Sequence, residues 1–169
     1  TDEPPQNWIA ANAGPGARVG YDPMLVSAEW LARYRDAGLT MVEASPNPVD
    51  VAWRDRPAPP SAPAVPHPLR YAGKPSSEKR AEVAAALREA KRDAAVVSDP
   101  ASIAWLLNIR GRDVDFTPFA LGFLLIEADE HATLLMDPAK LPDATREWLG
   151  NSVTVRPRDE LRPALAALA

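Results

Sequence analysis

The chain has 169 residues, of which 46% are hydrophobic, enough for one buried core or one core and part of a second. Its 19 basic and 23 acidic residues are interspersed and give a net charge of −4, so we expect no nucleic acid as a partner. It contains no cysteine, which excludes disulfides and thiol chemistry and fits a reducing compartment such as the cytoplasm. The longest nearly apolar run, residues 119–126, is too short to span a bilayer, so we expect no membrane partner either.

Residues 1–56 predict an incomplete α/β unit. The pattern indicates a short helix at 7–13, a strand at 17–21, a helix at 24–37 followed by Gly38, and a strand at 39–44 that ends at the Pro-rich turn of 45–48. One strand, one helix and one strand form a βαβ unit, which needs neighbouring strands to protect its sheet edges. Because the chain also lacks an initiator Met, we expect it to begin partway into a longer polypeptide, with the missing strands upstream of Thr1.

A proline-rich segment then marks the clearest boundary. Six prolines stand among residues 57–68, where the ring fixes φ and removes the N–H donor, so an extended connector is expected over 57–70. A proline-rich ligand for an SH3 or WW domain is the alternative. His67 lies in this segment without a second ligand at metal-binding spacing, which favours a surface residue.

A second α/β unit follows. The short apolar run at 94–98 has no polar alternation, as expected of a strand whose two faces are both covered by helices. Asp99 or Ser98 is expected to cap a helix whose first residue is Pro100. The remaining pattern predicts a helix from about 75 to 91, strands at 119–127 and 131–137 joined by a short hairpin, a helix at 141–149, a strand at 153–156 and a helix at 159–169. The fold class is therefore α/β, with a mixed sheet flanked by helices.

The motifs of common catalytic sites are missing. The only histidines, His67 and His131, belong to no HExxH-type or carboxylate-rich set, and the chain has no GxSxG, GxGxxG or P-loop motif. We therefore expect no catalytic residue, metal site or cofactor site in this chain alone.

The polar loop 108–115 is the remaining candidate for function. Its arginines can pair with carboxylates through two hydrogen bonds, and Gly111 allows a turn that other residues cannot make. The structural alternative is that Asp113 pairs with Arg110 or Arg112 inside the loop while Asn108 ends the preceding helix.

Three motifs together carry a family resemblance: WRDRP at 53–57, YAG at 71–73, and IAWLLNIRG at 103–111 with Asp113. The chain resembles the N-terminal region of three-domain Xaa-Pro aminopeptidases (aminopeptidase P) of the creatinase/prolidase, or pita-bread, superfamily. The resemblance implies part of a first creatinase N-terminal-like domain at 1–56, a linker at 57–70 and a second such domain at 71–169, with the catalytic domain absent.

In this family a C-terminal domain holds two divalent cations, typically manganese, through two Asp, one His and two Glu, and removes an N-terminal residue that precedes proline. The resemblance implies that this chain is inactive alone and partners its own catalytic domain, peptides with proline at the second position, and a second copy in a homodimer. It places Asn108, Arg110 and Asp113 at the mouth of the active-site cleft or at a domain interface, with Arg110 facing the substrate channel. An N-terminal domain of a creatinase or prolidase relative, or a non-enzymatic binding or oligomerisation module, is the alternative.

Overall fold

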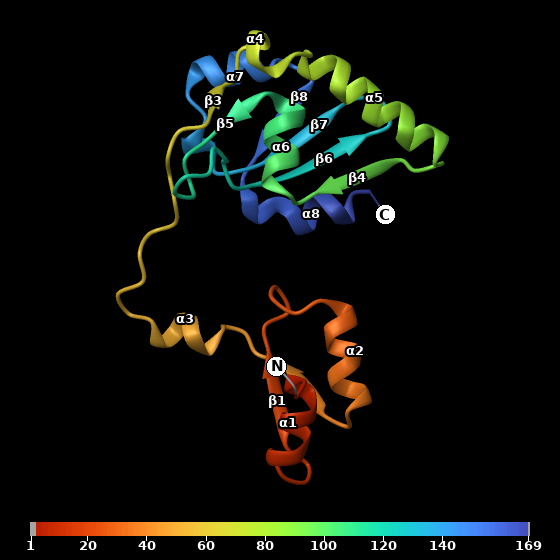
Figure 1. The fold of residues 1–169 in the computed structure, drawn as a ribbon, viewed down its shortest axis with the longest axis vertical. Coiled ribbons are helices and arrows are strands. Elements are labelled where there is room, and N and C mark those ends of the chain that lie inside the picture. The colour runs from red at the N-terminus through yellow and green to blue at the C-terminus, as the bar shows by residue number, and fades with distance from the viewer. Residues whose placement is uncertain (1–2, 169) are drawn as a thin grey trace. The chain divides into compact units, whose positions relative to one another are not determined.

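The computed structural model describes residues 3–168, and the chain divides into two compact units, Thr1–Ala58 and Pro59–Ala169. Each unit can be followed by its colour in Figure 1. The candidate loop, residues 108–115, lies entirely in the second unit.

The first unit is built on a parallel pair of strands. β1 (Arg18–Tyr21) and β2 (Thr40–Glu43) pair with Arg18 opposite Thr40, and α2 (Ala28–Asp36) connects them. This confirms the predicted βαβ unit. Two short helices, α1 (Pro5–Asn12) and α3 (Pro48–Ala52), precede and follow it.

The main differences from the prediction in this unit concern α2 and α3. α2 begins at Ala28 rather than Met24, because the Ser27 hydroxyl accepts a hydrogen bond from the Trp30 N–H (3.2 Å) and so caps the helix. No helix was expected where α3 begins, at the last residue of the predicted Pro-rich turn. Pro48 takes its first position, where no N–H is needed, and the Asn47 side chain accepts from the Val49 N–H (2.9 Å).

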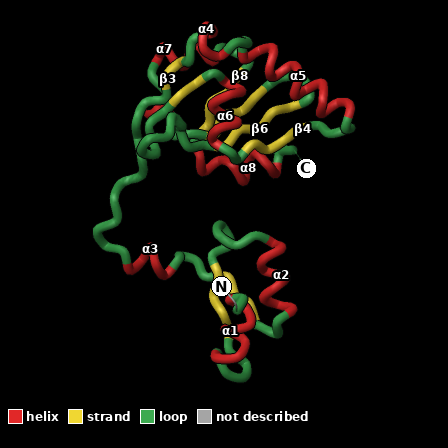
Figure 2. The backbone as a smooth tube through the Cα atoms, in the orientation of Figure 1, coloured by secondary structure: helices red, strands yellow, loops and turns green. Residues whose placement is uncertain are grey.

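The second unit contains a four-stranded mixed sheet in the order β4-β6-β7-β8. β4, β6 and β7 are antiparallel neighbours, and β8 runs parallel to β7. Figure 2 shows the strands side by side. Their bounds are β4 Ala94–Val97, β6 Phe123–Glu127, β7 Ala132–Leu135 and β8 Val153–Arg156. The predicted hairpin between the two central strands is confirmed.

The two faces of this sheet are covered by different helices. Leu124, Ile126 and Leu134 face the main core cluster, to which α6 (Pro100–Leu107) contributes. Leu125 and Leu135 point to the opposite face and pack against α8 (Leu161–Ala166). Figure 1 shows α8 and the long helix α5 (Ser76–Glu89) on opposite sides of the sheet. The predicted fold class, a mixed sheet flanked by helices, is confirmed.

The prediction for the strand at 94–98 was wrong in one respect. β4 is an edge strand that pairs antiparallel with β6 alone, and Val96 remains 50% exposed. Val96 lies opposite Leu125, on the α8 face, but outside the cluster that α8 covers. The unbroken apolar run of β4 therefore does not mean that both faces of this strand are buried.

Part of the proline-rich segment belongs to the second unit. β3 (Val65–Pro66) pairs antiparallel with β5 (Ile109–Arg110), and the neighbouring Ala64 is completely buried in the core cluster. The Ala64 N–H donates to the Lys140 carbonyl (2.8 Å), and its carbonyl accepts from the Thr145 hydroxyl (2.8 Å). Proline is tolerated in β3 because this strand has a single neighbour, so one side needs no N–H donor.

The remaining elements are short. The predicted C-terminal helix at 159–169 begins with a 3-10 turn before α8, and Ala169 lies outside the described residues. The others are α4 Leu69–Ala72, the 3-10 helix η1 Pro138–Lys140, α7 Asp143–Leu149 and the 3-10 helix η2 Arg158–Glu160. Across residues 3–168, none of the helices is both long and apolar enough to cross a membrane.

Candidate functional site

The helix α6 carries the chain into the candidate loop, and its start follows the prediction. Pro100 takes the first helical position, and the Asp99 carboxylate caps the helix by accepting from the Ser102 hydroxyl (2.6 Å) and the Ser102 N–H (2.8 Å). The Ser102 hydroxyl, followed by the Ser102 N–H, stabilises the charged carboxylate and holds the pKa of Asp99 below its ordinary value.

Asn108 ends this helix, as in the structural alternative considered for the loop, in the left-handed conformation (φ 51°). Its side chain is buried and bridges two parts of the second unit. The Asn108 Nδ2 donates to the Lys74 carbonyl (2.9 Å), and its Oδ1 accepts from the Lys79 Nζ (2.7 Å). Asn108 therefore joins the end of α6 to α5 and the residues that precede α5.

Three side chains donate hydrogen bonds to main-chain carbonyls in the last turn of α6. Arg110 donates to Ala104 (3.0 Å), Lys79 to Trp105 (2.9 Å) and Trp148 to Leu107 (3.2 Å). Two of these donors are cations, which stabilise the negative end of a helix dipole. Lys79 and Trp148 thus satisfy two carbonyls that the helix end leaves without intrahelical partners, and Arg110 adds a second donor to the Ala104 carbonyl, which also accepts from the Asn108 N–H.

Lys79 is an unusual member of this group because it is only 2% exposed. Its ammonium lies 4.6 Å from the centre of the Trp105 ring, a cation–π contact. Burial, followed by the nearby charges of Arg110 and Lys74, lowers the pKa of Lys79. The helix C-terminus, the Asn108 oxygen and the Trp105 ring therefore compensate a buried cation for which no salt bridge is found among residues 3–168.

Beyond β5, residues 111–119 form a narrow hairpin-like projection, here called the finger. The Gly111 N–H donates to the Pro118 carbonyl, and the Asp113 N–H donates to the Phe119 carbonyl, both at 3.1 Å. Near the tip, the Thr117 N–H donates to the Val114 carbonyl at 3.1 Å. These cross-links hold the two sides of the finger together.

Gly111 is required at the base of the finger by close approach. A Cβ at this position would lie 2.5 Å from the Ala120 backbone nitrogen and 2.6 Å from the Ala120 Cβ. The sequence analysis expected Gly111 to make a turn that other residues cannot make, but its φ is not positive. Glycine is required here because a side chain would collide with Ala120.

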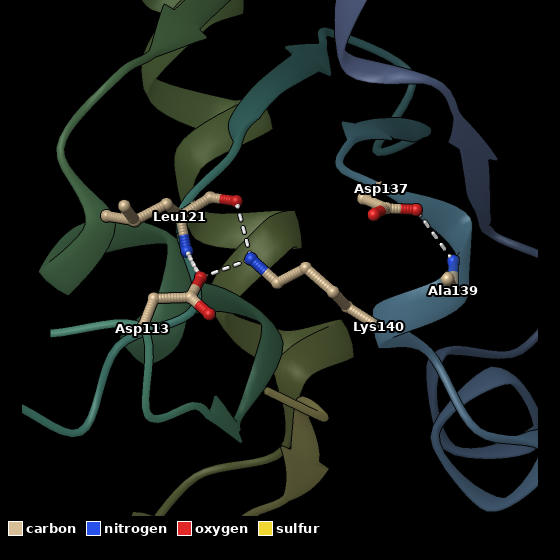
Figure 3. Close-up of polar contacts among 5 residues, drawn as sticks. All are labelled: Asp113, Leu121, Asp137, Ala139 and Lys140. Carbon is tan, nitrogen blue, oxygen red and sulfur yellow. Dashed lines mark hydrogen bonds and ion pairs between the residues drawn. The ribbon is translucent and has the colours of Figure 1, made fainter. Parts of the chain in front are cut away.

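Asp113 anchors the finger through a buried ion pair with Lys140, shown in Figure 3. The Asp113 side chain is 0% exposed and that of Lys140 is 4% exposed. The same carboxylate oxygen accepts from the Leu121 N–H (2.6 Å), and Lys140 also donates to the Leu121 carbonyl (3.3 Å). The alternative in which Asp113 pairs with Arg110 or Arg112 is therefore wrong.

Lys140 is itself placed by a local cap. The Asp137 side chain accepts from the Ala139 N–H (2.9 Å) at the start of η1, the short 3-10 helix that ends at Lys140. Both partners of the ion pair are thus held by neighbouring main-chain hydrogen bonds.

The outer part of the finger is exposed and borders a hollow of about 700 Å³. Phe116 at its tip is fully exposed and has a φ of 59°, which is rare for a bulky residue. Arg110, Arg112, Val65 and Pro63 are among the other residues that line the hollow. A strained, exposed aromatic residue beside an open hollow is typical of a binding surface.

The three predicted site residues therefore lie close together in the fold but differ in accessibility. Asn108 and the Asp113 side chain are buried and hold the backbone, whereas Arg110 is partly buried and reaches the wall of the hollow. Whether any of them borders a substrate channel stays a prediction.

Sequence reasoning missed Lys79 and Lys140, the buried partners of two of these residues. For Lys79 a signal was available, because it stands one turn before Val83 and two turns before Leu87, which pack against the core cluster. A lysine on the apolar side of an amphipathic helix suggests a buried partner. We find no comparable signal for Lys140.

Metal ligands do not gather in the part of the chain that the structure describes. No three His, Cys, Asp or Glu side chains among residues 3–168 lie close enough together to hold an ion.

His67 stacks on the Tyr71 ring with 5.8 Å between ring centres. Burial, followed by the charges of Arg110 and Lys79, lowers the pKa of His67.

Residues 55–169 match the family model of the creatinase/prolidase N-terminal domain. The chain belongs to this family. The matched residues include the four-stranded mixed sheet, the helices of the second unit and the finger.

The relatives found among curated proteins are named as Xaa-Pro aminopeptidases. A probable Xaa-Pro aminopeptidase P of Coccidioides posadasii is 35% identical over 97% of this chain and 28% of its own length. Another, from Pyrenophora teres f. teres, is 33% identical over 97% of this chain and 26% of its own length. The chain therefore spans about a quarter of the length of the relatives that it matches.

A solved structure of an X-prolyl aminopeptidase has a similar fold. The X-prolyl aminopeptidase of Caenorhabditis elegans, described as a cytosolic enzyme with a di-nuclear active site, matches with a TM-score of 0.89 and 28% identity. The match covers 98% of this chain and 28% of the other. The resemblance to Xaa-Pro aminopeptidases inferred from the sequence is confirmed.

Proposed function

We propose that the chain is the non-catalytic N-terminal portion of a metal-dependent Xaa-Pro aminopeptidase, an enzyme that removes an N-terminal residue preceding proline. The observation that carries the proposal is the match over nearly the whole chain to enzymes of this name, in sequence and in fold. The chain spans about a quarter of their length, so the two divalent cations, which we take to be manganese, are assigned to a catalytic domain in the rest of the polypeptide.

In this proposal the second unit covers the active site with its finger and helps to form a cytoplasmic homodimer. The cytosolic description of the Caenorhabditis elegans enzyme supports the compartment. The finger suits a covering role because its base is held by backbone hydrogen bonds and a buried ion pair, while its tip and the hollow remain exposed. A stiff projection can limit the length of peptide that enters a cleft without having to fold on each encounter.

The first experiment separates the catalytic role from the supporting one. The 169-residue chain and the full-length protein would be assayed with manganese on a Xaa-Pro-Xaa tripeptide, a Xaa-Pro dipeptide and creatine. We expect cleavage of the tripeptide by the full-length protein and no activity from the chain alone. Activity of the isolated chain would contradict the proposal. Turnover of only the dipeptide or creatine would favour a prolidase or creatinase relative, and no turnover at all would favour a binding module.

The covering role is tested through Arg110, which both supports α6 and lines the hollow. In the full-length protein Arg110→Ala is expected to lower kcat/KM, because the end of α6 loses a hydrogen bond beside the finger and the hollow loses a cation. An unchanged kcat/KM with normal stability would count against placing Arg110 at the substrate channel. Sedimentation of the full-length protein would test the homodimer separately.

A further inference from the structure

The two arginines at the finger differ in how their guanidinium groups are used. Arg110 is partly buried and donates to the Ala104 carbonyl (3.0 Å) and to its own strand neighbour Ile109 (2.8 Å). Arg112 is exposed, and within residues 3–168 its side chain makes no hydrogen bond or ion pair. Arg112 therefore presents a cation whose donors are all available.

The charges around the hollow leave an excess of positive charge. Arg110, Arg112 and Asp115 line it, giving two cations and one carboxylate. Asp113 does not add to this balance, because its side chain is buried and neutralised by Lys140. An anionic group entering the hollow would thus meet a net positive wall.

The rest of the lining suits an extended peptide. Apolar surface in the hollow is provided by Pro63, Val65, Val114, Phe116 and Pro118. Phe116 is fully exposed on a finger whose two sides are cross-linked by main-chain hydrogen bonds, so the position of its backbone is set before anything binds. Apolar walls with a guanidinium beside them match a short peptide that ends in a free carboxylate.

We infer that Arg112 binds the C-terminal carboxylate of short Xaa-Pro peptides in this hollow and so favours them over longer or blocked ones. This inference rests on the proposed function, because it concerns the substrate of that activity. Arg112 acts here in substrate selection and takes no part in bond cleavage. Asp113 anchors the finger on which Arg112 lines the hollow.

The test compares one tripeptide, Xaa-Pro-Xaa, as the free acid and as the C-terminal amide, in the full-length metal-loaded protein. For the wild type we expect a KM for the acid lower by roughly fivefold, as for an exposed charge pair near the upper end of its range. Arg112→Gln should abolish this preference, so that the KM values for the acid and for the amide become equal within the variant. Arg92→Gln is the matched control, because Arg92 is also exposed but does not line the hollow.

The outcomes separate this inference from the function on which it rests. If the wild type cleaves both peptides but does not prefer the acid, or if Arg112→Gln keeps the preference, carboxylate binding by Arg112 is refuted and the proposed function stands. If the wild type cleaves no Xaa-Pro peptide, the proposed function fails as well. Because acid and amide are compared within each variant, a partly unfolded preparation lowers both rates and does not imitate the expected result.

Discussion

Asp113 and Lys140, 27 residues apart in the sequence, form a buried ion pair that attaches the finger to the turn before α7. Both side chains are almost fully withdrawn from solvent. The Leu121 main chain binds both of them, because its N–H donates to Asp113 and its carbonyl accepts from Lys140. The pair explains how a polar loop at the surface is held in one conformation.

Removing the cation of this pair should destabilise the second unit strongly. Lys140→Met leaves the Asp113 carboxylate buried without a counter-charge, which typically costs about 3–5 kcal/mol. Urea unfolding of the 169-residue chain measures the change. Glu82→Ala is the control, because it breaks an exposed lysine–carboxylate pair with Lys74 (2.5 Å) and should have little effect. Equal effects of the two variants would show that the buried pair does not hold the finger.

Gly111→Ala should destabilise the protein by about 1–3 kcal/mol, as expected for overpacking against a rigid neighbour. The new Cβ would lie 2.5 Å from the Ala120 backbone nitrogen, so the finger or the following segment must move. Thermal unfolding and backbone amide spectra around residues 111–122 report the effect. Gly20→Ala is the control, since its Cβ would meet only the Ala44 Cβ at an ordinary 3.5 Å. A harmless Gly111→Ala would contradict the packing described at the finger base.

Two substitutions at Asn108 separate backbone strain from hydrogen bonding. Asn108→Gly and Asn108→Ala both lose the bonds to Lys79 and to the Lys74 carbonyl. Only alanine must also adopt the left-handed conformation with a Cβ, so it should be less stable than the glycine variant by roughly 1–2 kcal/mol. Chemical denaturation of both variants gives this difference directly. Equal stabilities would mean that Asn108 leaves the left-handed conformation when its side chain is removed.

The cap of α6 should make stability depend on pH at the acidic end. Hydrogen bonds from Ser102 lower the pKa of Asp99 in the folded chain, so the unfolded chain binds the proton more tightly and acid favours unfolding. The contribution of Asp99 is complete above its ordinary pKa of about 3.9 and is lost as the pH falls through the lower folded value. Comparing wild type and Asp99→Asn in urea from pH 2 to 6 isolates it. A difference that stays constant over this range would contradict the assignment.

Much of the fold could be predicted because its signals are local. Asp99 followed by Pro100 marks a helix start through groups within three residues, and Asn108 marks its end in the same way. The hairpin of β6 and β7 follows from two apolar strands separated by a short turn. The family motifs at 53–57, 71–73 and 103–111 identified the family from the same local information.

Contacts between residues far apart in the sequence could not be predicted from such local signals. The chain alone indicated a polar loop after α6, rich in arginine and aspartate, and the family to which it belongs. It did not indicate that Asp113 meets Lys140, that β3 in the proline-rich segment pairs with β5, or that Arg112 rather than Arg110 is left exposed. These contacts depend on which surfaces the packed core brings together, because the energy of a buried ion pair or strand pair arises only after that packing.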